Sequence, residues 1–286
     1  MEDTQQLIQR AAQDLVACNY AIALTGAGVS TESGIPDFRG PSGIWTKDPA
    51  AERRAYLSWD KFCEDPKGWW EERMAAAVGP MGDIAKREPN PSHYALAELE
   101  KVGILKCVIT QNIDGLHRKA GTGRVLEYHG CALKLRCMSC GIRFERNEFD
   151  LEKLLAEGQL PPLCPKCRGF IKTDTVGFGE PIPSDVAQGS LEETQKCDLM
   201  LICGTSAVVY PFAGLPRIAR QRRIEEEGTA AGGKPSVKRF KAVNIIEVNA
   251  DPTPLTHEGI SDYLIQGKTG EILPRIVELL KKLKSA

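Results

Sequence analysis

The chain has 286 residues, of which 42% are apolar and 26% are charged, and its formal net charge is −1. This composition is ordinary for a globular protein of one large domain, or of one large and one small domain. A net charge so close to zero excludes a strong overall attraction to nucleic acid or to membranes. Two short basic runs, at residues 217–223 and 281–284, are interpreted as solvated helix faces.

The N-terminus is polar and acidic, unlike a signal peptide, and no apolar stretch approaches the ~20 residues that span a bilayer. Ten cysteines are present. Of these, Cys107, Cys197 and Cys203 lie in or beside apolar runs, where thiols behave as small hydrophobic groups. We therefore expect free thiols and a cytoplasmic protein rather than a disulfide framework.

Two kinds of element alternate along the chain. Segments with apolar positions at helical spacing occur at residues 4–18, 93–102, 211–227 and 271–284. Apolar runs of strand length occur at residues 20–24, 104–110, 199–203, 243–248 and 263–265. This alternation predicts an α/β fold with a parallel sheet covered by helices on both faces.

Two stretches interrupt the alternation. Residues 36–90 hold Pro, Trp and short helical runs, and residues 131–173 hold two cysteine pairs. We expect them to fold together as a second, smaller domain inserted twice into the first. The Gly-rich, charged stretch at 225–237 is interpreted as a mobile surface loop.

The predicted strands end in small or amide side chains. These ends are Gly26-Ala27-Gly28, Gln111-Asn112-Ile113-Asp114, Gly204-Thr205-Ser206 and Asn249. In a parallel sheet, ligands bind outside the carboxyl ends of the strands. We therefore expect a wall at this edge that lets a large ligand approach and hydrogen-bond the backbone.

The turn at Gly26-Ala27-Gly28 has the pattern of a phosphate cradle, in which glycines let backbone N–H groups face a pyrophosphate. The third glycine of the usual dinucleotide pattern is absent, since Thr31 stands there. The loop that follows supports a nucleotide site, because Phe38 offers a stacking face and Arg39 can pair with phosphate.

Two Cys-x-x-Cys hooks, Cys137/Cys140 and Cys164/Cys167, have the spacing of a tetrahedral structural zinc site. Four thiolates leave no open position for a substrate, so we expect the metal to hold a module together. Two redox dithiols or unrelated core cysteines are the alternatives. His129 lies just ahead of this module, and a lone histidine is either structural or, because it titrates near neutrality, a general base.

The motifs Gly-Ala-Gly-Val-Ser, Gly-Ile-Pro-Asp-Phe-Arg-Gly, Thr-Gln-Asn-Ile-Asp-Gly-Leu-His, Tyr-His-Gly, the two cysteine hooks, Phe-Gly-Glu and Gly-Thr-Ser occur in the order seen in the sirtuins. The chain resembles this family of NAD-dependent protein lysine deacylases from about residue 20 to 270. The resemblance implies a large Rossmann-type domain (residues 1–35, 91–130 and 174–286) and a small zinc-bearing domain (36–90 and 131–173). NAD and an acyl-lysine peptide would enter the cleft between them.

The resemblance also implies site residues. His129 would remove a ribose hydroxyl proton, with Asn112 and Asp114 around the ribose and nicotinamide. From the residues alone, Asn112 and Asp114 are equally a capping turn after a strand. The cofactor would be lined by Gly26, Ala27, Gly28, Thr31, Asp37, Phe38, Arg39, Gln111, Ile113, Gly204, Thr205, Ser206, Asn249, Lys268 and Thr269. The substrate would be bound by Val176, Phe178, Gly179 and Val209, and zinc by Cys137, Cys140, Cys164 and Cys167.

Two features bear on the acyl group. Sirtuins that prefer succinyl or malonyl groups carry a Tyr and an Arg three apart, and residues 69–74 (Trp-Trp-Glu-Glu-Arg-Met) have no such pair. Their acidic residues are expected to disfavour an acidic acyl group. Gly177 is small where a larger side chain is common, which predicts a wider tunnel for longer chains.

The expected reaction transfers the acyl group from lysine to ADP-ribose and releases nicotinamide. Mono-ADP-ribosyl transfer and NAD hydrolysis are the alternatives, because the same electron-poor ribose carbon can meet another nucleophile. A zinc-ribbon module that binds DNA or protein is the non-enzymatic alternative. The segment between the hooks is mixed to acidic, which argues against nucleic acid. We expect acylated lysines of proteins as partners, and neither nucleic acid nor membrane.

Overall fold

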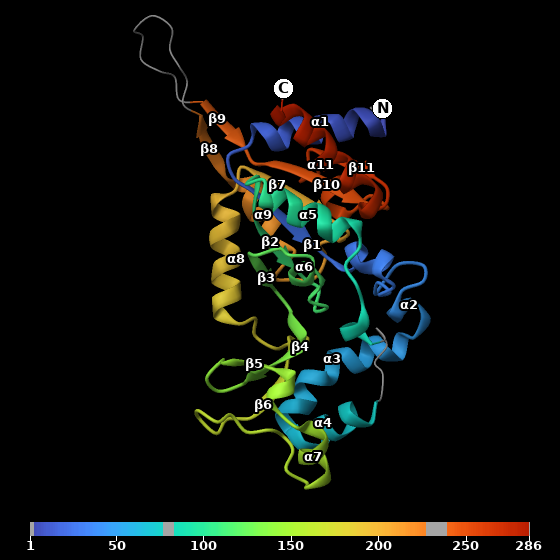
Figure 1. The fold of residues 1–286 in the computed structure, drawn as a ribbon, viewed down its shortest axis with the longest axis vertical. Helices are drawn as coiled ribbons and strands as arrows, with labels where there is room; N and C mark the ends of the chain where they lie inside the picture. Colours follow the sequence, from blue (N-terminus) through green and yellow to red (C-terminus); the bar gives the residue numbers. More distant parts are fainter. Residues whose placement is uncertain (1–2, 77–82, 227–238, 286) are drawn as a thin grey trace, which may run out of the picture.

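The computed structural model describes residues 3–76, 83–226 and 239–285. Its centre is a six-stranded sheet of order β11-β10-β7-β1-β2-β3, in which all paired strands run parallel (Figure 1). The strands are β1 (Ala21–Thr25), β2 (Leu105–Thr110), β3 (Val125–Glu127), β7 (Leu199–Cys203), β10 (Asn244–Asn249) and β11 (Tyr263–Gln266). The predicted α/β fold with a parallel sheet is confirmed.

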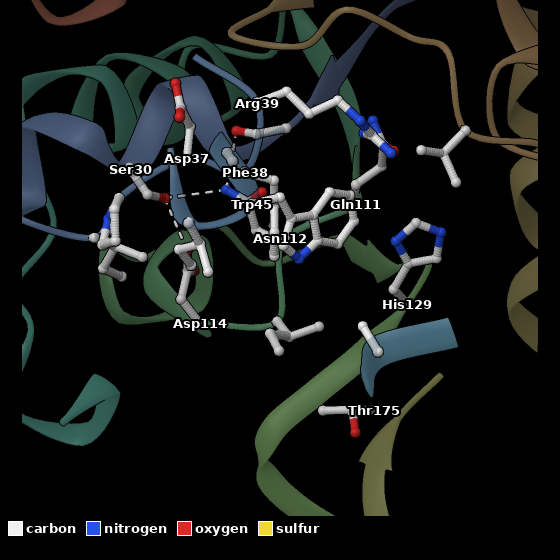
Figure 2. Close-up of a pocket in the computed structure, with 18 of the residues that line it drawn as sticks. Ser30, Asp37, Phe38, Arg39, Trp45, Gln111, Asn112, Asp114, His129 and Thr175 are labelled. Carbon is white, nitrogen blue, oxygen red and sulfur yellow. Dashed lines mark hydrogen bonds between the residues drawn. The ribbon is translucent and has the colours of Figure 1, made fainter. Parts of the chain in front are cut away.

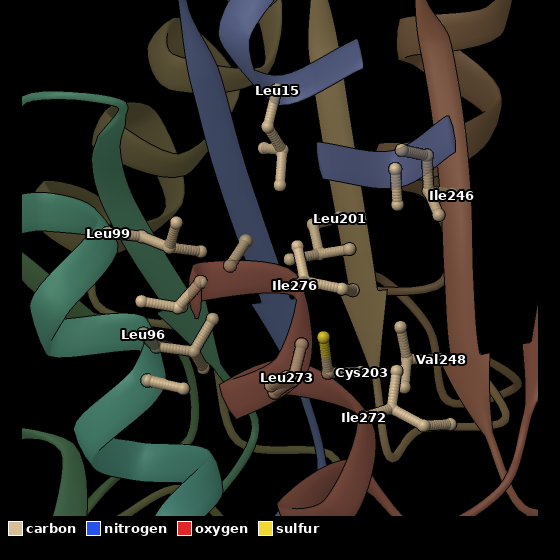
Figure 3. Packing of buried hydrophobic residues seen from close by; sticks show 14 of the residues in the cluster. Leu15, Leu96, Leu99, Leu201, Cys203, Ile246, Val248, Ile272, Leu273 and Ile276 are labelled. Atoms are coloured by element: carbon tan, nitrogen blue, oxygen red, sulfur yellow. The ribbon is translucent and has the colours of Figure 1, made fainter. Parts of the chain in front are cut away.

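The central strands are apolar throughout because both faces of the sheet are covered. Every residue of β1 and of β7 is buried. One face packs against α1 (Thr4–Ala17), α5 (Pro91–Lys101) and α11 (Thr269–Ser285), as the cluster in Figure 3 shows. The other face packs against α8 (Ser184–Lys196) and α9 (Gly214–Gln221). A strand buried on both faces reads as a continuous apolar run, which is why these strands were predictable.

The strand order reverses beside β1. From β1 the chain builds β2 and β3 on one side, and later β7, β10 and β11 on the other. The connections that leave the carboxyl ends of β1 and β7 therefore lead away from each other. A crevice is left between the ends of these two strands. In doubly wound sheets this switch point is where a dinucleotide binds.

A second, three-stranded antiparallel sheet lies at the opposite end of the molecule from the chain termini (Figure 1). Its order is β5-β4-β6, with β4 (Gly130–Cys137), β5 (Arg143–Glu145) and β6 (Ile171–Thr175). It shares a core with α3 (Pro49–Glu64), α4 (Pro66–Ala75) and α7 (Leu151–Ala156), built around Trp69, Trp70 and Leu135. The two interrupting stretches of the sequence thus pack on each other.

The start of α3 and of α4 follows from local chemistry. Asp48 precedes Pro49 and its carboxylate accepts the N–H of Ala50, while Asp65 precedes Pro66 and accepts the N–H of Gly68. An Asp cap followed by proline at the first helical position satisfies one free N–H and presets the helical φ.

The sequence expectation was wrong for part of one helix. The helix predicted at 211–227 is α9, which ends at Gln221, and the chain continues as β8 (Arg223–Glu226). β8 pairs with β9 (Arg239–Ala242), a partner that local periodicity does not reveal. The turn after β1 continues as a 3-10 helix, η1 (Ala27–Ser33), and α8 was not predicted. Most of the predicted loop at 225–237 lies outside the described residues.

Short elements complete the fold: α2 (Ile44–Lys47), η2 (Ile84–Lys86), α6 (Leu116–Lys119), η3 (Arg146–Glu148) and α10 (Pro254–His257). Among the described helices, none combines the length and apolar character needed to cross a membrane.

Candidate active site

One cavity of about 1580 Å³ opens at the carboxyl edge of the parallel sheet and extends toward α3 and β6. All residues predicted to act in catalysis or to bind cofactor or substrate line it. They are Gly26, Ala27, Gly28, Thr31, Asp37, Phe38, Arg39, Gln111, Asn112, Ile113, Asp114, His129, Val176, Phe178, Gly179, Gly204, Thr205, Ser206, Val209, Asn249, Lys268 and Thr269. Figure 2 shows that His129, Gln111 and Asn112 face the same space as Phe38 and Trp45. Residues more than 200 positions apart in sequence thus share one wall.

The two glycines of the first turn are required by close packing. A Cβ on Gly28 would lie 2.7 Å from Gly204 Cα, and a Cβ on Gly26 would lie 2.6 Å from Thr205 Cβ. The N–H groups of Gly26 and Gly28 donate to Cys203 and Gly204 carbonyl oxygens at 3.3 and 2.8 Å. These two N–H groups are therefore not available to a phosphate, and the phosphate cradle at this turn remains a prediction. Their role is to let the turns after β1 and β7 touch.

A buried network fixes Asn112 and Asp114 behind the cavity wall. Asn112 Nδ2 donates to the Gly26 carbonyl and to Ser30 Oγ, both at 3.0 Å, and Ser30 Oγ donates to Asp114 Oδ2 at 2.7 Å (Figure 2). The other carboxylate oxygen of Asp114 accepts the Leu116 N–H at 2.9 Å. Burial raises the pKa of the Asp114 carboxyl, and these two hydrogen bonds oppose the shift. The capping-turn alternative is therefore real at Asp114, whose carboxylate also lines the cavity.

A second chain of hydrogen bonds links the ends of β2, β7 and β10. Gln111 Nε2 donates to Thr205 Oγ1 at 2.7 Å, and the Thr205 N–H donates to Asn249 Oδ1 at 2.9 Å. Asn249 is held in turn by Glu247, whose carboxylate accepts from Asn249 Nδ2 at 3.4 Å. Since Thr205 Oγ1 also accepts the Ala207 N–H, its hydroxyl proton stays free to donate to a ligand.

His129 lies in the two-residue connection between β3 and β4, where the chain passes from one sheet to the other. Burial lowers the pKa of its imidazole below the ordinary value, and a hydrogen bond with the Gln111 backbone opposes this shift. The imidazole is consequently neutral at physiological pH. Its own carbonyl oxygen accepts the N–H of Val176 at 2.9 Å. The predicted base and the predicted substrate segment are therefore joined directly.

Aromatic side chains close the outer part of the cavity. The Phe38 and Trp45 rings are 4.8 Å apart, the Trp45 and Phe178 rings 6.0 Å apart, and Phe178 stacks on Tyr56 at 4.1 Å. The Arg39 guanidinium lies over Trp45, 4.5 Å from the ring centroid. These contacts connect the loop after η1 with the segment after β6.

The remaining predicted residues make simpler contacts. Asp37 Oδ1 accepts the Gly40 N–H at 3.1 Å, and Thr31 Oγ1 donates to the Gly28 carbonyl at 3.0 Å. The Thr269 hydroxyl lies 2.7 Å from that of Ser92, and Lys268 is exposed.

The four predicted metal ligands come together in the second sheet region. All four Sγ atoms lie within 4.8 Å of one another. The Cys137 and Cys167 sulfurs are 3.5 Å apart, and those of Cys140 and Cys164 are 3.8 Å apart. A tetrahedral Zn²⁺ with Zn–S bonds of ~2.3 Å separates its sulfurs by ~3.8 Å. The cluster therefore fits a structural zinc ion, and the alternative of unrelated core cysteines is excluded.

Several cavity residues were not singled out from the sequence. Ser30 and Trp45 line the cavity, and Tyr56 contacts its wall. Of these three, only Ser30 lies in a recognisable sequence motif, Gly-Ala-Gly-Val-Ser. The expectation that residues 69–74 disfavour an acidic acyl group considered only the acidic side chains of this segment. Glu72 is neutralised by an ion pair with Lys61, and Arg73 lines the cavity beside the Trp69 ring.

Comparison with known proteins gives a consistent result. Residues 26–211 match the Sir2 family. The chain is 44% identical to NAD-dependent protein deacylase 2 of Archaeoglobus fulgidus, with 100% of this chain and 99% of the relative covered. It is 41% identical to the NAD-dependent protein deacylase of Thermococcus kodakarensis, with 97% and 96% covered.

Solved structures of Sir2 proteins also match this chain. A Sir2 homologue mutant in complex with 2′-O-acetyl ADP ribose matches with a TM-score of 0.71 and 37% identity over 97% of this chain and 98% of that one. Sir2Af2 bound to a myristoylated histone peptide matches with a TM-score of 0.65 and 36% identity, over 98% and 99%. A family match over most of the chain and full-length relatives above 30% identity lead to one conclusion: the chain belongs to the Sir2 family, the sirtuins.

Proposed function

We propose that this protein is an NAD-dependent protein lysine deacylase that transfers the acyl group of an acylated lysine to ADP-ribose and releases nicotinamide. The observation that carries this proposal is the cavity at the point where the strand order reverses. Residues predicted to bind a dinucleotide, His129 and the Val176 segment all line this one cavity, and Val176 is bonded to His129. Full-length relatives named as NAD-dependent protein deacylases support it.

The cofactor wall is formed by residues whose contacts fit NAD. The turns after β1 and β7 touch at Gly28 and Gly204, which brings two backbone segments of the cofactor wall together. The free hydroxyl proton of Thr205 and the buried carboxylate of Asp114 supply one donor and one acceptor. Bound NAD would supply an electron-poor ribose carbon once nicotinamide leaves, and Phe38 and Trp45 would keep water from it.

His129 acts as the general base. A neutral imidazole can take a proton from a ribose hydroxyl, and the lowered pKa of His129 keeps it neutral across the physiological range. Asn112 and Asp114 orient the nicotinamide and ribose, because their side chains are fixed by Ser30 and by backbone groups.

The substrate binds along the segment from Val176 to Gly179. Among the described residues, no protein group bonds the Val176 carbonyl oxygen or the Phe178 N–H, so both can pair with an extended peptide. Such pairing reads backbone rather than sequence. Val209 lines the same cavity and would contact the same peptide.

We also propose an acyl preference that extends beyond acetyl. Gly177 lines the cavity together with Trp59 on α3, and a Cβ on Gly177 would lie 3.3 Å from Trp59 Cβ. Because glycine adds no side chain there, it takes no cavity space from a longer acyl chain. The Sir2Af2 relative bound to a myristoylated peptide supports the same idea.

The chain is proposed to divide into a Rossmann-type domain (1–35, 91–130 and 174–286) and a small domain (36–90 and 131–173) that Zn²⁺ holds together. Separate apolar cores in the two regions support this division. Ten free cysteines support a reducing compartment, and we propose the cytoplasm.

The test is to incubate the purified protein with NAD and with acetyl-, succinyl- and myristoyl-lysine peptides, and to follow nicotinamide release and the fate of the acyl group. We expect peptide-dependent nicotinamide release and acylated ADP-ribose as product. Labelled protein would indicate ADP-ribosyl transfer, and peptide-independent release of free ADP-ribose would indicate NAD hydrolysis. Either result in place of acylated ADP-ribose contradicts the proposal.

A further inference from the structure

Four charged side chains are buried directly behind the substrate segment. Arg136 on β4, Lys172 and Asp174 on β6, and Glu180 have side chains that are 8%, 4%, 2% and 1% exposed. Burying charges is costly unless each is paired and hydrogen-bonded. The four form ion pairs with one another, and Asp174 also pairs with Arg143. Glu180 Oε1 lies 2.7 Å from Arg136 Nη2, Glu180 Oε2 lies 3.0 Å from Lys172 Nζ, and Asp174 Oδ1 lies 2.7 Å from Arg136 Nε.

The network also holds the backbone on which the peptide is proposed to bind. Lys172 Nζ donates to the Thr175 carbonyl oxygen, and to that of Thr173 at 3.1 Å. Glu180 Oε2 accepts the Gly177 N–H at 2.9 Å. The residue between these two anchors is Val176, whose N–H donates to the His129 carbonyl oxygen. Consecutive residues 175–177 are therefore tied in turn to Lys172, to the residue of the general base, and to Glu180.

We propose that Lys172 and Glu180 are positioning residues for the acyl-lysine substrate. Their ion pair fixes residues 175–179 in the conformation that receives the peptide, and through Val176 it sets that segment in register with His129. This inference rests on the proposed function, since it takes the 176–179 segment as the peptide site.

Because position 172 is a lysine, its ion pair with Glu180 depends on pH. An arginine at this position would remove that dependence. The groups facing Lys172 are Glu180, Arg136, Arg73, Cys63 and the Trp69 ring. Burial lowers the pKa of Lys172 to about 8, and Glu180 opposes this shift while the two arginines add to it. As pH rises through about 8, Lys172 loses its proton and the ion pair with Glu180 is lost. Arginine stays charged throughout this range.

The test measures KM for an acyl-lysine peptide and KM for NAD, at pH 7 and pH 9.5, in the wild type and in Lys172→Met, Lys172→Arg and Glu180→Gln. At pH 7 we expect Lys172→Met and Glu180→Gln to raise the peptide KM about tenfold, the scale of a lost charge-assisted hydrogen bond, with the NAD KM within about twofold. The wild-type peptide KM should rise between the two pH values, and Lys172→Arg should abolish this rise.

Exposed Lys153 on α7 provides matched controls, because Lys153→Met and Lys153→Arg make the same changes away from the network. Zinc content shows whether each variant keeps the small domain folded. If Lys172→Met does not fold, the inference is tested by the peptide KM of Lys172→Arg at pH 7 and pH 9.5 alone. An unchanged peptide KM in zinc-loaded Lys172→Met, equal increases in both KM values, or a persistent alkaline rise in Lys172→Arg overturns the inference.

Phe178→Ala separates this inference from the function beneath it. If Phe178→Ala raises the peptide KM and Lys172→Met does not, the positioning role fails while the peptide site stands. If the wild type consumes no acyl-lysine peptide, the proposed function fails and the inference with it.

Discussion

Burial acts in opposite directions on two ionisable side chains of the cavity wall. It raises the pKa of the Asp114 carboxyl and lowers the pKa of the His129 imidazole. In both cases burial shifts the equilibrium toward the neutral form, because a poorly solvated site penalises charge. For His129 this is the form that accepts a proton, so desolvation would suit its proposed role as the general base. For Asp114, hydrogen bonds from Ser30 and Leu116 oppose the effect and keep its oxygens oriented.

Replacing His129 with alanine should separate chemistry from cofactor binding. We expect the turnover of acyl-lysine peptide to fall by ~10²-fold or more, the usual scale for a lost general base. NAD affinity should change little, because Gly28, Thr205 and Asn249 are untouched. Steady-state kinetics and NAD titration check both parts. Turnover close to wild type would remove His129 from this role.

The pH dependence of the wild type follows from the same residue. The base is lost when His129 gains a proton, so kcat/KM should fall as pH decreases through the pKa of His129. Since that pKa is lowered, the acid limb should have its midpoint below the ordinary histidine value of ~6.5. A midpoint above 6.5 would contradict the burial argument.

At the scale of elements, the cavity depends on two loops meeting without side chains. The turn after β1 and the turn after β7 touch at Gly28 and Gly204, and Gly204 has a φ of 57°. A Cβ on Gly204 would lie 2.4 Å from the Val29 nitrogen. Both the close approach and the left-handed backbone therefore require glycine at position 204.

Gly28→Ala should reduce stability and cofactor affinity together. The new Cβ would meet Gly204 Cα at 2.7 Å, and overpacking of this kind costs about 1–3 kcal/mol. Gly214→Ala on α9 is the control, because no atom lies within 4 Å of its added Cβ. Urea unfolding should show a loss for the first variant and none for the second, and NAD titration should weaken only for the first.

Gly177→Val should change acyl selectivity. The added side chain would crowd Trp59 on α3 and take up cavity space beside it, so a long acyl chain should be excluded before a short one. We expect the myristoyl to acetyl ratio of kcat/KM to fall about tenfold or more. Gly123→Val, remote from the cavity, should leave the ratio unchanged. An unchanged ratio in Gly177→Val would mean that the acyl chain takes another path.

At the scale of the whole molecule, the small sheet region acts on the catalytic cavity through β4 and β6. β4 begins at Gly130, one residue after His129, and also carries Cys137. β6 ends at Thr175, directly before the proposed substrate segment. A metal that holds the cysteine cluster thus fixes both strands that lead into the cavity. We therefore expect the chemistry to depend on a metal that lies away from it.

Zinc removal should abolish deacylation while NAD binding persists. Structural zinc contributes folding free energy directly, so its loss should disorder the small region and leave the six-stranded sheet intact. Activity, NAD titration and zinc content after chelation check this, and added Zn²⁺ should restore turnover. Cys137→Ser should behave like the chelated protein, whereas Cys63→Ser, outside the cluster, should not. Full turnover in verified zinc-free protein would contradict the prediction.

Folding stability should decrease in acid through two buried histidines. His93 and His117 have ring centroids 4.9 Å apart, and burial lowers the pKa of His93 to about 4 and that of His117 well below the ordinary value. Between about pH 6.5 and 4 the unfolded chain binds protons that the folded chain does not. Stability is therefore full above pH 6.5 and falls by up to ~1.4 kcal/mol per pH unit for each histidine below it.

Urea unfolding at pH 7.5 and pH 5 measures this loss. His93→Gln should reduce the difference between the two pH values, and His257→Gln, at an exposed position of α10, should not. An equal difference in all three proteins would mean that other groups cause the acid sensitivity.

The sequence alone determined the class of fold, the metal ligands and the family. Strands such as β1 and β7 are buried on both faces, so their apolar runs are unambiguous, and thiolate hooks at fixed spacing need no tertiary information. Motif order assigned the remaining cavity residues by resemblance. Each of these signals is local, because it depends on residue type at short spacing.

Only the tertiary structure decided how those residues work. It shows that the N–H groups of Gly26 and Gly28 bond within the protein, that 211–227 divides into α9 and β8, and that Lys172 pairs with Glu180 beside the proposed peptide site. Each of these depends on a partner that is distant in sequence or on the side to which a backbone group points. Neither composition nor periodicity encodes such pairings, because they arise only when the chain closes on itself.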